Sequence, residues 1–376
     1  MSIKRTLLFF IGRDSYFLSH RLPTARAAIW AGYDVHVIAA DSGLKDRIED
    51  EGFIVHPRWL AEDRVALLSL LAGIIQLIIT AYQVKARIIQ VVGLRYAIAG
   101  LLSSLFLPWT RFIFSINGLG FLFAKNRQKI IHRIARRVIL SLFTIIATVR
   151  KIEIAFQNDD DLKHFTNRTT LRNAAIHLIR GSGVDTDTYT PIPLPVSQKI
   201  VFGVASRMIK IKGINDIIKA FRHLIDEGVP VKLVLAGDID AANPDSLSAA
   251  NIQSQCRKGE IEWLGYVDDM AGFWAQCHVA MLGSHGGEGL PMSLLIPAAM
   301  ARPIICSDTS GNRDLVDDAK NGYLCPAGDV DAIKTAVTKI LDDDLVAFGM
   351  YSRTLIHDRQ MDAQSVARQF AILYQD

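Results

Sequence analysis

Short runs rich in valine, isoleucine and other apolar residues alternate along this chain with longer helical stretches and glycine turns. Two strands separated by a helix must be joined by a crossover, so they pair in parallel. The alternation therefore predicts an α/β fold with parallel sheets. The strongest strand candidates are residues 7–11, 34–39, 88–92, 112–116, 200–204, 231–236 and 303–307.

The chain is long enough for two domains. Its 376 residues exceed what one ordinary core organises, and because half of them are hydrophobic, two domains can each bury a core. Residues 189–195 carry a proline at every second position from 191, which favours an extended linker. We therefore predict a first domain over residues 1–185, a second over 196–355 and a C-terminal helical segment over 356–376.

Cysteine usage gives no sign of a disulfide framework or a zinc site. Cys256, Cys277, Cys306 and Cys325 all lie in the second half of the chain without a close pair. We therefore expect neither of these features and predict a reducing, cytoplasmic location. The apolar run 7–11 is too short for a signal peptide, which leaves it as the first strand.

The charges are distributed unevenly. Residues 1–190 hold 25 Lys/Arg and 15 Asp/Glu, and no acidic residue occurs between Asp63 and Glu153, where 13 basic residues lie. A basic, apolar half suggests an anionic partner, either a membrane leaflet or nucleic acid. The chain shows no nucleic-acid-binding module, and the interleaved residues are aliphatic, so we predict an anionic membrane surface and no nucleic acid.

Two helical segments could meet that membrane. Residues 65–82 are the most apolar stretch, and they predict either a buried helix of the first domain or a helix inserted into one leaflet. Residues 126–140 place Ile130, Ile131, Ile134 and Val138 on one helical face with basic residues around it. A solvated basic face is the alternative for this second segment.

The sharpest motif of the chain places a carboxylate in a glycine-flanked turn before a helix. Helix N-termini attract phosphates, so a carboxylate beside one can bind sugar hydroxyls while the helix holds phosphate. The motif consists of Gly287, Glu288, Gly289, Leu290 and Pro291. It resembles the donor-binding signature of the retaining GT-B glycosyltransferases of family 4, the Glu-x7-Glu group.

The resemblance extends over most of the chain. It implies the GT-B architecture, in which two Rossmann-like domains face a central cleft and the last helix crosses back to the N-terminal domain. Arg207 and Lys212 match the family's Arg and Lys-Gly pattern, so the resemblance assigns them to the diphosphate, where cations replace a metal and no cofactor is needed. Tyr266 and Val267 look like the segment whose backbone receives the nucleotide base. For Arg207 and Lys212 an exposed basic loop is the alternative.

Motifs of the first domain narrow the resemblance. The glycine loop at Gly12 follows the first strand, where such loops commonly face the inter-domain cleft, so Gly12 is a candidate donor-binding residue. Residues 117–121, 156–162 and 180–185 look like the branch that glycosylates polyprenyl-diphosphate-linked sugars in bacterial surface-glycan assembly. The acceptor-binding candidates that follow are His20, Arg21, Asn117 and Gly118. A helix surface explains His20 and Arg21 equally well.

One position departs from the family. Ile296 stands where the second glutamate would hydrogen-bond the ribose, and Pro297 follows it inside the expected helix. Isoleucine accepts no hydrogen bond, and an interior proline removes one from the backbone. Ribose recognition by this position is therefore in question.

The resemblance implies a retaining glycosyltransferase. It would move a hexose or N-acetylhexosamine from a nucleotide diphosphate sugar, with UDP expected, to a lipid-linked saccharide at the inner face of the cytoplasmic membrane. A catalytically degenerate protein that binds a nucleotide or a partner at the membrane is the alternative, supported by Ile296. A nucleotide-sugar epimerase would need acid/base pairs that the sequence does not offer.

Overall fold

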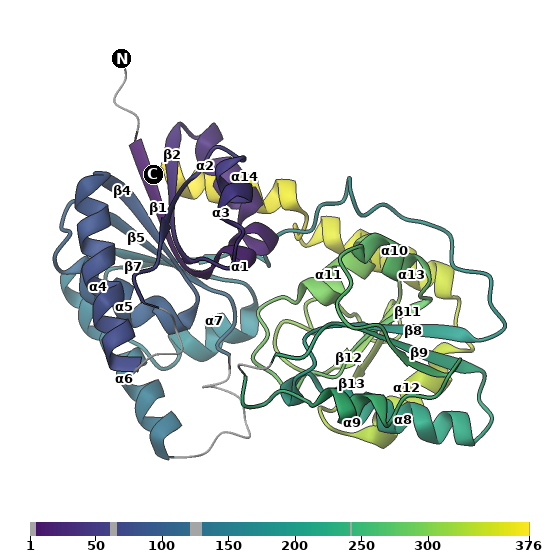
Figure 1. Cartoon of the computed structure of the whole chain (residues 1–376). Coiled ribbons are helices and arrows are strands. Elements are labelled where there is room, and N and C mark those ends of the chain that lie inside the picture. Colours follow the sequence, from purple (N-terminus) through teal and green to yellow (C-terminus); the bar gives the residue numbers. More distant parts are fainter. Residues whose placement is uncertain (1–4, 61–65, 121–129, 241–242, 376) are drawn as a thin grey trace. The chain divides into compact units, whose positions relative to one another are not determined.

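The computed structural model describes residues 5–60, 66–120, 130–240 and 243–375, and the chain divides into two units. Unit 1 comprises Met1–Gly183 and Ala363–Asp376, and unit 2 comprises Val184–Asp362. Each unit is built on one parallel sheet flanked by helices (Figure 1), so the predicted α/β class is confirmed. All seven predicted strands coincide with observed strands, apart from residue 303, which precedes its strand.

Unit 1 contains a seven-stranded sheet in the order β3-β2-β1-β4-β5-β6-β7. Its strands are apolar along their length because a parallel sheet covered by helices is buried on both faces. The strands are β1 (Arg5–Arg13), β2 (Tyr33–Ala40), β3 (Ile54–Pro57), β4 (Ala86–Val92), β5 (Arg111–Ile116), β6 (Ile152–Phe156) and β7 (Ala174–Leu178).

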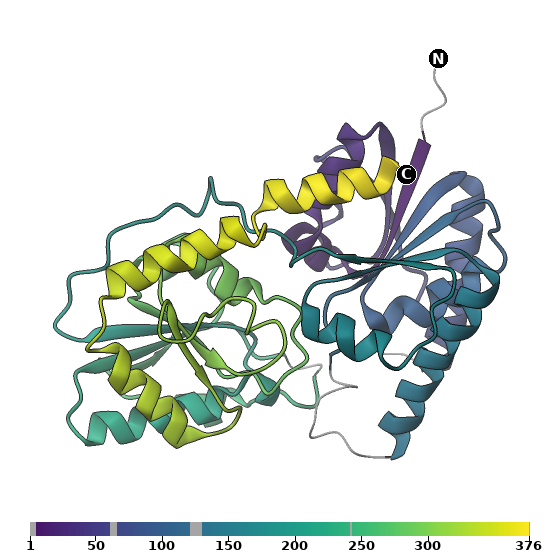
Figure 2. The ribbon, with the colours of Figure 1, turned by 180° about the vertical axis from the view of Figure 1, so that it is seen from behind.

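Helices cover both faces of this sheet. Alternate residues of β1 point to opposite faces, so Leu7 and Phe9 join one buried cluster and Leu8 and Phe10 join another. The first cluster packs against α1 (Asp14–His20), α2 (Leu22–Trp30), α3 (Lys45–Glu49) and the last helix, α14 (Ala363–Gln375). Figure 2 shows α14 beside α2, on which it packs.

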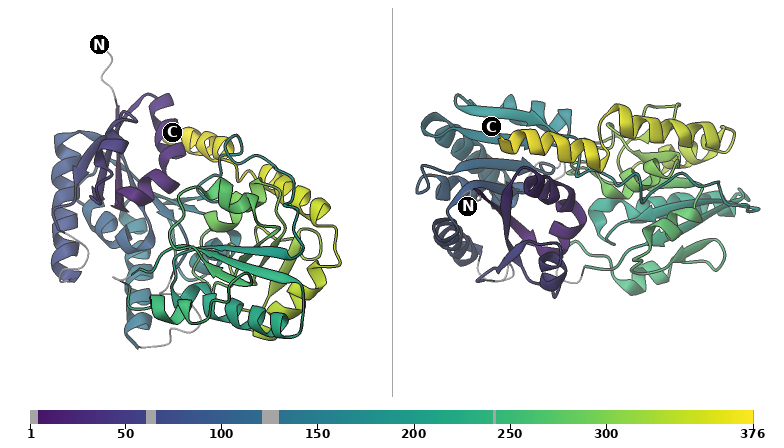
Figure 3. Two further views of the ribbon diagram at one scale, coloured as in Figure 1. Left: turned by 45° about the vertical axis from the view of Figure 1, so that its right-hand side comes forward. Right: turned by 90° about the horizontal axis from the view of Figure 1, so that it is seen from above.

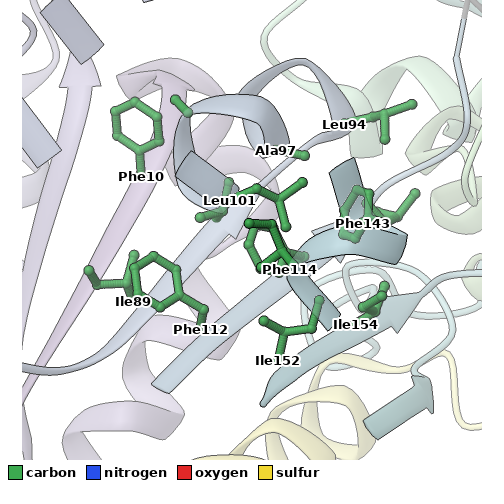
Figure 4. Close-up of a cluster of buried hydrophobic side chains, with 14 of the residues drawn as sticks. Phe10, Ile89, Leu94, Ala97, Leu101, Phe112, Phe114, Phe143, Ile152 and Ile154 are labelled. Carbon is green, nitrogen blue, oxygen red and sulfur yellow. The ribbon is translucent and has the colours of Figure 1, made fainter. Parts of the chain in front are cut away.

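The second cluster of unit 1 packs against α4 (Ala66–Gln83), α5 (Leu94–Ser104), α6 (Ile130–Val149) and α7 (Asp159–Thr166). Phe114 of β5 lies near its centre, and its ring meets Phe143 of α6 edge-on at 5.3 Å between centroids (Figure 4). Aromatic pairs in this geometry add to the free energy gained from burying their area. The cluster thus fixes α5 and α6 on the sheet.

Helices α4 and α6 are each buried on one side only. Leu77 and Ala81 of α4 are buried, whereas Leu71 and Ile75 are exposed. The interpretation of residues 65–82 as a wholly buried helix is therefore wrong for one face. On α6, Ile130, Ile134 and Val138 share an exposed face, while residues 126–129 and the side chain of residue 131 lie outside the described part of the chain.

Unit 2 contains a six-stranded parallel sheet in the order β10-β9-β8-β11-β12-β13. Its strands are β8 (Ile200–Ala205), β9 (Val231–Ala236), β10 (Ile261–Trp263), β11 (Val279–Leu282), β12 (Ile304–Ser307) and β13 (Gly322–Cys325). Its helices are η2 (Lys210–Lys212), α8 (Ile214–Asp226), α9 (Ala249–Gln253), α10 (Met270–Ala275), α11 (Met292–Ala299), α12 (Val330–Ile340) and α13 (Leu345–Asp358). Gly322 to Leu324 pair with β12 as part of β13.

A fully buried arginine ties the proline-rich segment to unit 2. The Arg302 guanidinium donates to the carbonyl oxygens of Ile192 (2.9 Å), Pro193 (3.3 Å), Met300 (3.3 Å) and Trp274 (3.2 Å). Burial lowers the pKa of Arg302. Without the guanidinium, these carbonyl groups would lose their donor in a site that excludes water.

We expect Arg302→Met to lower the free energy of unfolding by about 2 kcal/mol, since buried carbonyls lose a charged donor. Arg257→Met is the matched control, because Arg257 pairs with the exposed Asp226 at 2.6 Å and surface pairs contribute about 0–1 kcal/mol. Denaturant unfolding of both variants measures the difference. Equal losses would refute the anchoring role of Arg302.

Candidate functional site

Apart from Gly12, which lies in unit 1, the predicted donor residues lie at one edge of the unit 2 sheet. Since all its strands are parallel, their carboxyl ends lie at the same edge, where ligands of α/β sheets bind. The segment after β8 carries Arg207 and Lys212, and the segment after β11 carries Glu288. The segment after β10 carries Tyr266 and Val267 at that edge.

Lys212 and Glu288 meet directly. The Lys212 Nζ lies 2.5 Å from the Glu288 Oε1, and the Ser284 hydroxyl donates to the same oxygen at 3.1 Å. The two charged side chains are only 14 % and 17 % exposed, so water screens their attraction weakly. The structure therefore brings together two of the three predicted catalytic residues, although they are 76 positions apart.

Glycine makes this approach possible. Gly213 adopts a φ of 68°, and a Cβ there would collide with the carbonyl oxygen of Gly283. Gly311, with a φ of 79°, approaches the carbonyl oxygen of Gly289 in the same way. The main chain at Gly213, next to Lys212, thus packs against one end of the segment that carries Glu288. The loop after β12 packs against its other end.

Arg207 lies apart from this pair. Its guanidinium donates to the Asp240 carboxylate at 2.8 Å, and its side chain is 63 % exposed. With one partner this exposed, the ion pair holds its side chains weakly. The role of Arg207 at a diphosphate stays a prediction.

A second polar pair beside the site was missed by the sequence analysis. The His285 Nε2 lies 2.7 Å from the Asp216 Oδ2 in the first turn of α8, and the His285 N–H donates to the Ile211 carbonyl at 2.8 Å. The Ile211 contact joins the segment that carries Glu288 to the segment that carries Lys212, and the Asp216 contact joins it to the start of α8. The available signal was the position of His285, three residues before Glu288 in a loop already assigned to the ligand.

The predicted base-binding segment has a defined shape. Tyr266 is exposed, whereas Val267 packs against the core of unit 2. Asp269 caps α10 by accepting from the Gly272 N–H at 2.8 Å. This cap fixes the end of the segment and leaves the Tyr266 side chain open to a planar ligand.

Ile296, which stands where the family has its second glutamate, lies in the core of unit 2. Ile296 is buried within α11 and packs with Leu294 and Leu295 in one apolar cluster. Pro297 follows inside the helix and leaves one backbone hydrogen bond unmade. Pro291 of the motif precedes α11, whose first residue is Met292. The Ile296 side chain can accept no hydrogen bond from a ribose.

In unit 1 the acceptor candidates gather around Tyr16. The Arg21 guanidinium donates to the Asn117 side-chain oxygen, and the Asn117 amide donates to the Tyr16 hydroxyl at 2.9 Å. The His20 ring stacks on the Tyr16 ring at 4.1 Å between centroids. The sequence therefore located a genuine polar cluster at the carboxyl end of β1 and β5, next to Gly118.

Arg21 is not the helix-surface residue of the alternative interpretation. It lies between α1 and α2, is fully buried, and its Nε has no hydrogen-bond partner in the structure. Burial lowers the pKa of Arg21 because desolvation disfavours the charged form. Its contact with Asn117 means that it can act on a ligand through that amide.

The motifs of the first domain converge on this cluster. The Leu119 N–H donates to the Asp161 carboxylate at 3.1 Å, and the Arg180 guanidinium pairs with Asp159 at 2.5 Å. These contacts join the three segments that follow β5, β6 and β7. Gly12, at the end of β1, packs against the Tyr96 side chain of α5, which leaves no room there for a Cβ.

Across the described ranges, no group of three His, Cys, Asp or Glu side chains could hold a metal ion. At the donor edge, the Lys212 ammonium and the Arg207 guanidinium are the predicted substitutes for a metal ion. Metal independence stays a prediction.

The comparisons with known proteins agree with this arrangement. Residues 199–343 match the family model described as glycosyl transferases group 1, and that range contains the Lys212–Glu288 pair. The chain is a glycosyltransferase. The range that matches the group 1 model lies within unit 2.

Two bacterial relatives of this glycosyltransferase are themselves named as glycosyltransferases. The capsular polysaccharide biosynthesis glycosyltransferase CapM of Staphylococcus aureus is 21 % identical over 83 % of this chain and 81 % of its own length. The N,N'-diacetylbacillosaminyl-diphospho-undecaprenol α-1,3-N-acetylgalactosaminyltransferase of Campylobacter jejuni is 22 % identical over 69 % of each chain.

The solved structures establish the fold of the glycosyltransferase. The Anabaena protein Alr3699/HepE, solved in complex with UDP and glucose, superposes with a TM-score of 0.77 over 99 % of this chain and all of its own, at 16 % identity. Sucrose-phosphate synthase from Thermosynechococcus elongatus gives a TM-score of 0.79 over 99 % of this chain and 98 % of its own, also at 16 % identity. The predicted GT-B fold is confirmed.

The close approach at Gly213 can be tested with alanine. We expect Gly213→Ala to lower the free energy of unfolding by about 1–3 kcal/mol more than Gly228→Ala, because only the first Cβ meets the backbone of another segment. Both glycines have a positive φ, so the cost of that conformation cancels in the comparison. Denaturant unfolding measures both variants.

Transfer activity of the same variants gives a second measurement. A shifted Lys212 loop should abolish glycosyl transfer in Gly213→Ala, and Gly228→Ala should keep it. Full activity in Gly213→Ala would show that the approach of Gly213 to Gly283 does not position Lys212.

Proposed function

We propose that this protein is a retaining glycosyltransferase of family 4, in the branch that extends polyprenyl-diphosphate-linked saccharides. It transfers a hexose or N-acetylhexosamine from a UDP-sugar to a lipid-linked acceptor. The Lys212–Glu288 pair at the carboxyl edge of the unit 2 sheet carries this proposal. The pair sets a cation and a hydroxyl-binding carboxylate side by side, as a nucleotide sugar requires.

The chemistry assigns a separate task to each charge. In the transfer, the bond from the sugar's anomeric carbon to the diphosphate breaks, the acceptor hydroxyl oxygen bonds to that carbon, and the hydroxyl proton passes to an oxygen of the departing diphosphate. Lys212 stabilises the negative charge of the departing diphosphate, and the exposed Arg207 exchanges Asp240 for the same group. Glu288 accepts hydrogen bonds from the sugar hydroxyls and orients the ring, while Gly287, Gly289 and Leu290 shape the loop around it.

Features of the chain and its relatives support the donor and the acceptor. The Anabaena protein of the same fold was solved with UDP, and the name of the Campylobacter relative includes a diphospho-undecaprenol acceptor. The first half of this chain is basic, and the Asn117 and His20 cluster offers polar groups to an anionic acceptor. All four cysteines are free, which suits a reducing cytoplasm and the inner face of the membrane.

The assigned charges can be removed one at a time. Lys212→Met and Glu288→Gln should each lower the rate of transfer by about 10²–10³-fold or more, the usual effect of losing one charge-stabilising group. Lys210→Met and Glu262→Gln are matched controls, since Lys210 is exposed two residues away and Glu262 pairs with Lys232 at 2.9 Å. Steady-state transfer from a UDP-sugar panel measures all four.

The result that contradicts the roles is equal transfer by Lys212→Met and Lys210→Met, or by Glu288→Gln and Glu262→Gln. The stereochemistry is read separately, from the anomeric configuration of the product by nuclear magnetic resonance. An inverted product would overturn the retaining mechanism and leave the glycosyl transfer intact.

A further inference from the structure

Helix α4 is apolar on the side that it turns away from the sheet. Its 18 residues include no charged side chain. Leu68, Leu71, Ile75, Ile79 and Tyr82 follow one another at spacings of three and four residues, and each is between 39 and 56 % exposed. Figure 3 shows α4 at the rim of unit 1. A surface helix in water carries polar residues on this side, so the outer stripe of α4 fits a non-aqueous neighbour.

The stripe continues across the connection between α5 and β5. Leu105, Phe106 and Trp109 of this connection are exposed. The Tyr82 ring at the end of α4 lies 5.0 Å from the Trp109 ring, and the Tyr82 hydroxyl donates to the Phe106 carbonyl at 3.3 Å. The connection thus extends the apolar stripe of α4 sideways.

Helix α6 adds a second stripe on the same layer. Ile130, Ile134, Val138, Ile145 and Val149 are between 46 and 66 % exposed on one side of α6. Arg150, which follows α6, donates to the carbonyls of residues 107, 108 and 110. Because α5 packs against both α4 and α6, the two stripes and the connection belong to one layer, here called the outer apolar face.

The charges around the outer apolar face are all of one sign. No acidic residue occurs from residue 64 to residue 152. Lys85 and Arg87 follow α4, Arg133 and Arg137 lie on α6, Lys151 follows α6, and all five are exposed. Each basic residue near an anionic leaflet contributes about 1 kcal/mol of attraction. A second copy of this face would instead bring five cations against five cations.

The geometry favours a helix that lies on the bilayer. Within the described ranges no helix is both long and apolar enough to cross a membrane. Tyr82 and Trp109 stand where the stripe meets the connection, and such aromatic side chains prefer the level of the lipid headgroups. One buried and one exposed apolar side on α4 suits a helix that packs on its own domain and dips into one leaflet.

We propose that the outer apolar face of unit 1 docks the protein on an anionic lipid bilayer, with the stripes of α4 and α6 at the acyl boundary and the five basic side chains on the headgroups. The inference deepens the proposed function, since it gives the membrane partner a defined surface. It does not depend on the donor sugar or on the acceptor.

Vesicle co-sedimentation of the full chain tests the docking. The protein should pellet with phosphatidylcholine vesicles that contain phosphatidylglycerol and remain largely in solution with phosphatidylcholine alone. Leu71→Glu/Ile75→Glu should lower the partition coefficient by at least about tenfold, since the bilayer no longer buries two apolar side chains of the protein surface. Val346→Glu/Met350→Glu on α13 is the matched control, because those two side chains are equally exposed in unit 2.

Tryptophan fluorescence locates the contact. Brominated phosphatidylglycerol should quench the protein, and Trp109→Phe should remove much of that quenching. Trp30→Phe should not, although Trp30 is 78 % exposed, because α2 covers the other face of the sheet. Quenching that is lost with Trp30 and kept with Trp109 would overturn the proposal.

Two further outcomes are distinguishable. If Leu71→Glu/Ile75→Glu dissociates a dimer measured by light scattering and leaves vesicle binding unchanged, the face binds a second copy and the proposal fails. Transfer to a water-soluble acceptor analogue should persist in the same variant. If the wild-type protein transfers no sugar to that analogue while its vesicle binding is intact, the proposed function is refuted and the docking surface stands.

Discussion

The contact between the main chains at Gly213 and Gly283 is the constraint on which the donor edge depends. A loop after β8 and a loop after β11 can present Lys212 and Glu288 to one ligand only if their backbones touch, and a side chain at Gly213 would keep them apart. The ion pair at 2.5 Å is a consequence of this packing. The charges are therefore held before a substrate arrives, which lowers the reorganisation that transfer requires.

Most of the sheet framework could be predicted from the sequence, because strands buried on both faces are continuous apolar runs. Segments such as β11 and β13 were missed, since four residues carry too little pattern and their pairing depends on neighbours far along the chain. Asn321 illustrates the difficulty. Before glycine it has the composition of a turn, yet its amide binds the Leu315 carbonyl and the Ser352 hydroxyl while Gly322 pairs with β12.

The site was predictable where residue type and local spacing carry the chemistry. Glu288 stood out because a carboxylate between glycines before a helix has few structural uses. The partners of the charges were not predictable: Arg207 with Asp240 and His285 with Asp216 join segments that only the register of the sheet brings together. Burial was likewise hidden. Arg21 follows a polar stretch, and nothing in its local sequence indicates a fully buried guanidinium.

Helices α8 and α4 differ in the composition of the sides that face away from their sheets, and this difference argues for a special environment at the outer apolar face. Helix α8 of unit 2 buries Ile217 and Phe221 and exposes Asn215, Lys219 and His223, the arrangement expected in water. Helix α4 likewise buries apolar residues on its inner side, but its outer side exposes leucines and isoleucines. The same chain can build amphipathic helices, so the apolar exterior of α4 belongs to its position in unit 1. A lipid leaflet removes that exposure while leaving the sheet beneath it unchanged.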